Sequence, residues 1–96
     1  MKYILHPDAK RELQDAIDYY EERQNGLGYD FSLEVYSAIK RIVNNPKAWT
    51  ILEDDIRRCM TNRFPYGIIY SEQDHEIYIL AVMNLRRHPD YWKYRR

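Results

Sequence analysis

Basic and aromatic side chains that could bind a nucleic acid gather in the second half of this 96-residue sequence. Arginine binds phosphate through its planar guanidinium, and aromatic rings stack on bases. A histidine among them could add acid–base chemistry, because imidazole titrates near neutral pH. The set predicts a surface for an anionic partner, although its last two residues could simply form a frayed basic end. Its members are Arg57, Arg58, Arg63, Arg86, Arg87, His88, Tyr91, Trp92, Lys93, Arg95 and Arg96.

The other residue types argue against a metal or cofactor site. The three histidines, His6, His75 and His88, lie far apart without Cys or carboxylate at ligand spacing. Three glycines are too few for a phosphate-binding loop. Cys59 is the only cysteine, so no internal disulfide forms, and its place in a predicted strand indicates a buried free thiol. We therefore expect neither metal nor cofactor.

Charge is unevenly distributed along the chain although its formal net charge is zero. Residues 1–56 hold seven Lys/Arg and eleven Asp/Glu, whereas residues 57–96 hold eight and four. This segregation indicates either a face for an anionic partner or a basic sheet that lies against acidic helices. Both interpretations stay open from the sequence.

The first half of the chain predicts one short strand and two helices. The strand covers Lys2–His6, and Pro7–Arg23 follows as a helix with apolar residues at steps of three and four. Pro7 suits the first helical position. Gln24-Asn25-Gly26-Leu27-Gly28 forms a turn, because Asn and Gly tolerate the left-handed conformation. A second helix carries the apolar positions Phe31–Ile42 and ends at Asn44-Asn45-Pro46.

The second half predicts three antiparallel strands joined by short turns. They cover Arg57–Asn62, Phe64–Tyr70 and His75–Met83, with a polar turn at Ser71–Asp74. We place the acidic run Glu53-Asp54-Asp55 in a solvated loop. In the last strand, alternation predicts two faces: Ile77, Ile79 and Ala81 on one, and Tyr78, Leu80 and Val82 on the other.

This order predicts a two-layer α+β fold, β-α-α-β-β-β, with the helical hairpin packed on one face of a mostly antiparallel sheet. The opposite face is left for solvent or a partner. The length suits one domain over residues 1–96. No apolar run approaches the roughly 18 residues of a membrane span, and the N-terminal apolar run is too short for a signal peptide. We therefore expect a cytoplasmic protein.

Short motifs in a fixed order resemble the RelE/ParE superfamily of toxins, many of which are described as plasmid stabilisation proteins. The resemblance covers nearly the whole chain. Its motifs are His6-Pro7-Asp8-Ala9 with Leu13, Tyr19-Tyr20-Glu21, Gly26-Leu27-Gly28, Asn45-Pro46, Arg63-Phe64-Pro65-Tyr66 with Ile68-Ile69-Tyr70, Ile79-Leu80-Ala81-Val82, and Arg86-Arg87-His88-Pro89-Asp90-Tyr91-Trp92.

The resemblance implies the same strand–helix–helix–three-strand fold and a growth-inhibiting toxin of a type II toxin–antitoxin pair. It also implies a cognate antitoxin that binds the toxin in a hetero-oligomer. Two targets occur in this superfamily: DNA gyrase for ParE-like members, and messenger RNA on the ribosome for RelE-like endoribonucleases. A non-toxic relative that serves only as a binding module, and a free-standing nucleic-acid binder, are the other hypotheses.

The nuclease hypothesis assigns roles to four residues. Attack of a 2′-hydroxyl on phosphate needs a base, a cation and a proton donor. His88 would be the acid or base, Arg63 and Arg87 would hold the phosphate, and Tyr91 would stack a base or relay a proton. The set proposed for target or nucleic-acid binding comprises Arg57, Arg58, Arg63, Arg86, Arg87, Trp92 and Lys93.

Several features favour the gyrase hypothesis instead. The sequence pI is about 6.8, whereas a protein that docks on ribosomal RNA should be strongly basic. The lysine-rich strand of RelE-like enzymes is also absent, since no Lys lies between Lys47 and Lys93.

Structural roles compete with the catalytic ones. His88 before Pro89 suits a turn, and Trp92 suits a lid on the core. The three arginines Arg58, Arg63 and Arg87 could pair with helix carboxylates such as Glu12 or Asp15.

Overall fold

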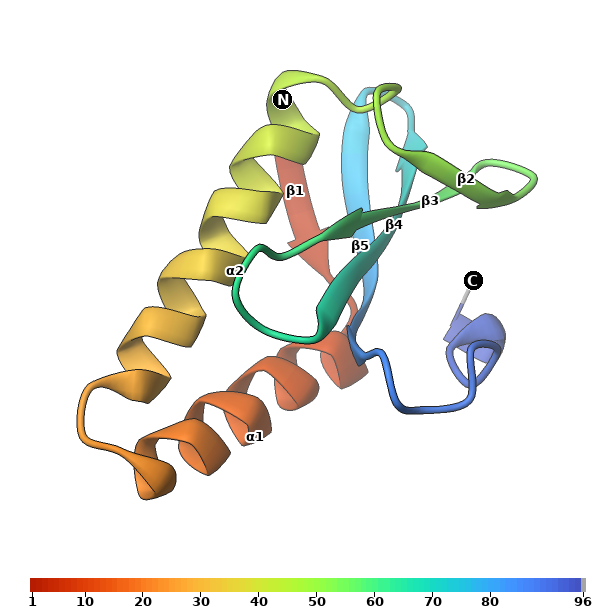
Figure 1. The fold of residues 1–96 in the computed structure, drawn as a ribbon. Helices are drawn as coiled ribbons and strands as arrows, with labels where there is room; N and C mark the ends of the chain where they lie inside the picture. Colours follow the sequence, from red (N-terminus) through yellow and green to blue (C-terminus); the bar gives the residue numbers. More distant parts are fainter. Residues whose placement is uncertain (96) are drawn as a thin grey trace.

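Two helices and a five-stranded mixed sheet make up the protein, which confirms the predicted α+β class (Figure 1). The computed structural model describes residues 1–95, so Arg96 lies outside the described residues. The elements are β1 (Lys2–Leu5), α1 (Pro7–Arg23), α2 (Leu27–Asn44), β2 (Thr50–Glu53), β3 (Ile56–Met60), β4 (Tyr66–Gln73), β5 (Glu76–Asn84) and the short 3₁₀ helix η1 (Lys93–Arg95).

The sheet has the strand order β1-β5-β4-β3-β2. Strands β2 to β5 form an antiparallel meander, and β1 adds to β5 in parallel, with Lys2 opposite Glu76 and Leu5 opposite Ile79. A parallel neighbour requires a long connection. Here the helical hairpin carries the chain from β1 to β2 at the opposite edge of the sheet, and β3 and β4 lead back to β5. The first and last strands of the chain are therefore adjacent in the sheet.

One strand, β2, was not predicted from the sequence. Thr50–Glu53 is an edge strand with exposed Ile51 and Leu52, so its residues show no alternation of buried and exposed positions. Glu53 accordingly ends a strand, whereas we had placed it in a loop. The predicted turn at Ser71–Asp74 is also wrong, because β4 continues to Gln73.

The turn between β4 and β5 consists of Asp74 and His75, whose φ angles are 51° and 64°. Two consecutive left-handed residues match the right-handed twist of a tight hairpin.

The helical hairpin is held together at its turn by a close approach of backbones. The Gly28 amide donates to the Glu21 carboxylate at 3.1 Å, and Gly26 donates to the same group at 3.0 Å. A Cβ on Gly28 would lie 2.5 Å from the Ile17 carbonyl oxygen. The predicted turn is confirmed at Gln24-Asn25-Gly26 but is shorter than expected, because Leu27 and Gly28 already belong to α2. Gly28 lets α2 start against α1. Neither helix is long and apolar enough to cross a membrane.

The main core lies between the helices and one face of the sheet. Ala9, Leu13 and Ala16 of α1 meet the apolar face of α2 and the inward side chains of β3, β4 and β5. Cys59 is a buried free thiol in this core, as predicted, and burial raises its pKa.

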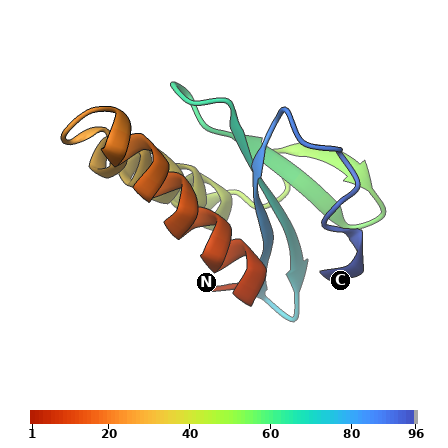
Figure 2. The same cartoon turned by 90° about the horizontal axis from the view of Figure 1, so that it is seen from below.

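A second, smaller core covers part of the opposite face of the sheet, which we had expected to be open. Trp92 is 1% exposed and packs with Ile56, Ile69, Leu80, Ala81 and Met83. Figure 2 shows the sheet between the helical hairpin and the C-terminal segment. The chain after β5 therefore folds back and closes this face itself.

A bulge in β5 changes the predicted alternation. Ile69 pairs with Ala81 and Tyr70 with Ile79, so Leu80 is the extra residue. Leu80 and Ala81 both belong to the second core, whereas Val82 joins Ile79 in the main core. The placement of Ala81 with Ile79 was therefore wrong, because an inserted residue reverses the faces that follow it.

Candidate functional site

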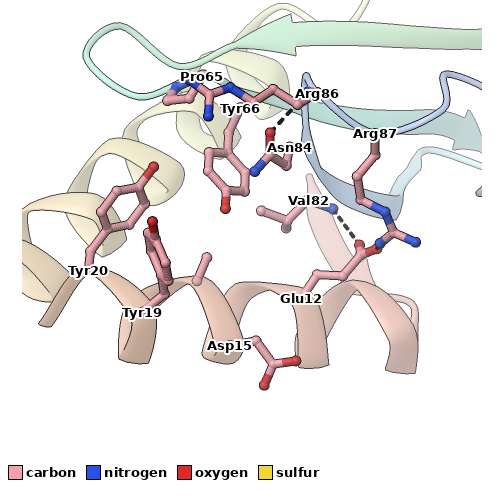
Figure 3. A pocket seen from close by; sticks show the side chains of 11 residues that line it. Glu12, Asp15, Tyr19, Tyr20, Pro65, Tyr66, Val82, Asn84, Arg86 and Arg87 are labelled. Atoms are coloured by element: carbon pink, nitrogen blue, oxygen red, sulfur yellow. Dashed lines mark hydrogen bonds and ion pairs between the residues drawn. The ribbon is translucent and has the colours of Figure 1, made fainter. Parts of the chain in front are cut away.

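A hollow of the surface lies between α1 and the ends of β4 and β5 (Figure 3). Its volume is about 560 Å³. We call it the tyrosine groove. It is lined by Glu12, Asp15, Ala16, Tyr19, Tyr20, Pro65, Tyr66, Val82, Asn84, Arg86 and Arg87.

Helical spacing places one wall of the tyrosine groove. Asp15, Ala16, Tyr19 and Tyr20 follow Glu12 by three, four, seven and eight residues, so all five share one side of α1. Tyr19 is half exposed, and its hydroxyl accepts a hydrogen bond from Arg23 at 2.7 Å. The wall therefore carries aromatic rings at one end and carboxylates at the other.

The inner wall of the groove joins an aromatic cluster of the main core. The Tyr20 ring centroid lies 4.8 Å from that of Phe64 and 5.2 Å from that of Phe31. The Tyr66 ring lies 4.8 Å from Phe31 and 6.2 Å from Tyr20. Burial raises the pKa of both Tyr20 and Tyr66, so their hydroxyls stay protonated at neutral pH. The groove thus combines a firm apolar wall with neutral hydroxyl groups.

Glu12 is the centre of the polar end of the groove. Its carboxylate accepts hydrogen bonds from the Val82 amide at 3.0 Å, from Arg87 at 3.3 Å, and from both terminal nitrogens of Arg95 at 2.9 and 3.0 Å. Arg95 also donates to the Leu80 carbonyl oxygen at 3.0 Å. The Val82 amide and the Leu80 carbonyl oxygen thus gain hydrogen-bond partners at the part of β5 where β1 no longer pairs. We call this arrangement the Glu12 clasp.

Tyr91 lies inside the Glu12 clasp. The Arg87 guanidinium stacks 3.7 Å from the centre of its ring, and that of Arg95 lies 5.0 Å away. Burial raises the pKa of Tyr91, and the nearby Glu12 carboxylate raises it further. A phenol with a raised pKa gives up its proton less readily, so Tyr91 is a weaker proton donor in this environment.

Two other candidate catalytic residues have structural partners of their own. The Nδ1 atom of His88 accepts a hydrogen bond from the Asp90 amide at 3.2 Å, so His88 stabilises the turn at Pro89. Arg63 forms an ion pair with Asp30 of α2 at 3.3 Å. The structure therefore brings Arg87 and Tyr91 together but attaches Arg63 to a different helix.

Two predicted binding residues outside the clasp, Arg57 and Lys93, have partners within the protein. Arg57 donates to the carbonyl oxygens of Lys47 and Trp49, at 3.1 and 2.8 Å. Lys93 pairs with Glu53 at 2.8 Å. These contacts secure the α2–β2 connection and η1.

Among the remaining predicted binding residues, only Arg86 keeps both exposure and a place in the groove. Arg58 lies half buried beside Trp92, on the sheet face opposite the helices. Trp92 is buried, so it forms the lid on the core and offers no face for stacking a base. Arg86 is exposed at the groove and forms no ion pair within residues 1–95.

The segregated charges meet across the fold. Arg87 and Arg95 pair with Glu12, Arg63 with Asp30, and Lys93 with Glu53, so basic residues of the second half neutralise acidic residues of the first. For Arg87 the structure agrees with the alternative interpretation, a pairing with the helix carboxylate Glu12. The expectation of a frayed basic end is wrong for Arg95, whose side chain is 5% exposed. Residues 1–95 also hold no cluster of three or more potential metal ligands.

Sequence reasoning missed the tyrosine groove as a site. The spacing of Asp15, Tyr19 and Tyr20 on α1 was visible, but we assigned that helix only a core face. Tyr66 and Asn84 join them through strand pairing, since they are opposite residues of β4 and β5. Helical spacing could therefore have found one wall, while the other depends on the register of the sheet.

Comparisons with known proteins agree with this architecture. The family model described as the ParE toxin of the type II toxin–antitoxin system parDE matches residues 3–89. A solved structure titled as a chromosomal ParDE toxin–antitoxin system from P. aeruginosa superposes with a TM-score of 0.74 at 19% identity, covering 90% of this chain and 97% of that chain. A comparison with curated proteins gave no significant match. From the extent of the family match, the chain belongs to the ParE toxins of type II toxin–antitoxin systems.

Proposed function

We propose that this protein inhibits bacterial growth by acting on DNA gyrase and that a small cognate antitoxin neutralises it. The main support is the Glu12 clasp. It engages Arg87 and Arg95 with one carboxylate and encloses Tyr91 between their guanidinium groups. A ribonuclease would need such cations to face a phosphate, whereas here they stabilise the C-terminal segment. Their geometry suits a structural clasp better than a catalytic centre.

Electrostatics supports the same choice between targets. Docking on ribosomal RNA relies on clustered, unpaired cations. In this chain the net charge is zero, and Arg63, Arg87, Lys93 and Arg95 are already paired with carboxylates. A protein target such as gyrase does not require a strongly basic surface. Either target would place the action in the bacterial cytoplasm.

The tyrosine groove is the proposed surface for protein recognition. Aromatic residues with hydroxyl groups and arginines are enriched at the centres of protein interfaces. Here Tyr19 and Arg86 are exposed at the groove, while Tyr20 and Tyr66 form a firm wall. Such a surface suits a peptide segment of gyrase or of the antitoxin, and a bound antitoxin would give a hetero-oligomer.

The proposal is tested by inducible expression in bacteria, followed by two biochemical assays on the purified protein. We expect growth arrest that a co-expressed antitoxin relieves, and inhibition of gyrase supercoiling that persists in His88→Ala. Transcript cleavage at ribosomal positions that is lost in Arg87→Ala and His88→Ala would identify an endoribonuclease and refute the gyrase proposal. Absence of toxicity, with a tight complex to the antitoxin, would instead identify a binding module. Lys10→Ala, at an exposed position of α1 that does not line the groove, serves as the control variant.

A further inference from the structure

The outer side of α2 faces away from the sheet (Figure 1). Along it runs a stripe of exposed side chains. It consists of Tyr29, Leu33, Tyr36 and Lys40, and we call it the α2 stripe. Tyr29 is 65% exposed, Leu33 49% and Tyr36 47%. Their separations of four, three and four residues are those of a two-helix seam, in which each side chain packs between side chains of a facing helix. Nothing within residues 1–95 covers these three apolar side chains.

The spacing of the α2 stripe is the same in both directions. The separations of four, three and four residues read the same from either end of the stripe. If the α2 of a second copy packs antiparallel, Tyr29 of each copy therefore lies opposite Lys40 of the other, and Leu33 of each lies opposite Tyr36 of the other. We propose that two copies of this protein associate through antiparallel pairing of their α2 stripes. The inference concerns the isolated chain and does not rest on the proposed target or on the antitoxin.

Each opposing pair in this register is chemically suited. Tyr29 would meet the ammonium group of Lys40 from the second copy, and a cation over an aromatic ring is attracted to it. Leu33 would pack against the Tyr36 ring. Lys40 of one copy would lie opposite Tyr29 of the other copy, and eleven residues separate that Tyr29 from the second Lys40. At about 1.5 Å per residue the two Lys40 positions are roughly 16 Å apart along the axis, so their charges repel each other only weakly.

The residues beside the α2 stripe allow the helices to approach. Ser32 and Ser37 flank it and would be opposite each other in the same register. Their hydroxyl groups already have partners in their own helix: Ser32 donates to the Tyr29 carbonyl oxygen at 2.7 Å, and Ser37 accepts from Arg41 at 3.0 Å. Pairing the helices would therefore bury small side chains without leaving these hydroxyl groups unsatisfied.

The area of the α2 stripe sets the expected strength of the dimer. With roughly 200 Å² for a tyrosine side chain, the three exposed apolar residues leave on the order of 300 Å² on each copy. Two copies would bury about half of the ~1,200 Å² typical of the smallest stable interfaces. We therefore expect a weak, reversible dimer with a dissociation constant on the order of 100 μM.

Sedimentation velocity on the purified full chain, from about 5 to 500 μM, tests the proposal. The sedimentation coefficient should rise with concentration toward that of a dimer. Leu33→Glu should abolish the rise, and Lys40→Glu should weaken dimerisation at least tenfold. Lys10→Glu makes the same charge change on the exposed side of α1 and should leave dimerisation intact. A monomer at every concentration, or equal loss in the Lys10→Glu control, would overturn the proposal.

Disulfide trapping tests the register independently of the strength of association. Tyr29→Cys and Lys40→Cys chains are mixed in equal amounts and oxidised, with the buried Cys59 thiol left in place. Antiparallel pairing predicts disulfides between the two variants and few within either one. Parallel pairing would instead link like variants, and random collision would give the two like pairs and the mixed pair in the ratio 1:2:1. Either of these results would refute the proposed register.

Discussion

Glu12 and Arg95 are 83 positions apart in the sequence, yet their side chains form two parallel hydrogen bonds of 2.9 and 3.0 Å. The pair binds backbone groups at the edge of β5, beyond Ile79, where the pairing with β1 ends. The Val82 amide donates to Glu12, and the Leu80 carbonyl oxygen accepts from Arg95. Two side chains thus take the place of a neighbouring strand, and they attach the C-terminal segment to the first helix.

Replacing Glu12 should destabilise the protein strongly. Glu12→Gln removes the carboxylate that binds both terminal nitrogens of the 5%-exposed Arg95 and leaves only Asp8, 3.7 Å from its Nε, as a counter-charge. Breaking a buried ion pair costs about 3 kcal/mol. Urea denaturation should show this loss in the free energy of unfolding. Asp15→Asn, an exposed carboxylate on the same side of α1, should change it by less than about 0.5 kcal/mol. Equal effects of the two variants would show that the clasp contributes no more than a surface charge.

Removing the Trp92 ring should open the second core. Trp92→Ala deletes a fully buried side chain and should cost about 3–5 kcal/mol in the free energy of unfolding. Tyr94→Ala removes an exposed ring two residues away and should cost less than about 1 kcal/mol. Thermal unfolding of both variants makes the comparison. A mild effect of Trp92→Ala would mean that the C-terminal segment is not docked on the sheet in solution.

The two glycines of the helical hairpin should respond differently to alanine. Gly28→Ala places a Cβ 2.5 Å from the Ile17 carbonyl oxygen, so the helices must separate, and we expect a loss of about 2–3 kcal/mol. Gly26 has a φ of 85° with open space around it, so Gly26→Ala should cost about 1 kcal/mol from backbone strain alone. Chemical denaturation of the two variants would reveal the order, and a larger loss for Gly26→Ala would contradict it.

The free energy of unfolding should fall at high pH because Tyr70 is buried. Burial raises the pKa of Tyr70 to about 12 from an ordinary value of 10.0. Between these values the unfolded chain loses the phenolic proton while the folded chain keeps it, so unfolding becomes easier as pH rises. The expected loss from Tyr70 between pH 10 and 12 is about 2 kcal/mol.

Denaturation curves at several pH values test this, with Tyr70→Phe as the comparison. The variant loses the hydrogen bond from the Tyr70 hydroxyl to the Pro46 carbonyl oxygen, so it should be less stable near neutral pH. Its stability should nevertheless decline less steeply above pH 10. Parallel curves for the two proteins would assign the alkaline loss to other groups.

Toxicity should depend on the groove rather than on His88. Arg86 is exposed at the groove without an ion pair in the described residues, so Arg86→Glu should reduce growth inhibition at least tenfold while unfolding changes little. His88→Ala should leave growth inhibition unchanged. The opposite ranking of these variants, with equal protein levels, would move the functional site to the turn at Pro89.

The elements that could be predicted are those specified by local sequence. α1 was assigned with its observed bounds, because Pro7 and the apolar spacing define it without reference to other elements. β2 could not be predicted, because Ile51 and Leu52 are exposed and only pairing with β3 makes them a strand. The bulge at Leu80 could not be predicted for a related reason. The neighbouring residues of β5 are all apolar, so their types do not indicate which face of the sheet each one occupies.

The site was harder to predict than the fold. His88 and Arg87 were singled out by type and position, but the role of Arg87 depends on Glu12, 75 residues away. Arg95 resembled a flexible basic end, because nothing local indicates that a terminal arginine is buried. The partners of these charges are set by the way the chain closes on itself, and that information is distributed over the whole sequence.

The parallel pairing of β1 with β5 also affects how fast the protein can fold. Lys2 is matched with Glu76, so this contact closes a loop of more than 70 residues. Closing so long a loop has a large entropic cost before any pairing repays it, and folds rich in such contacts form in milliseconds to seconds. The helical hairpin and the β3–β4–β5 meander are local and can form earlier. We therefore expect docking of the first strand to be the slow step of folding, during which the edge of β5 is open to pairing with other chains.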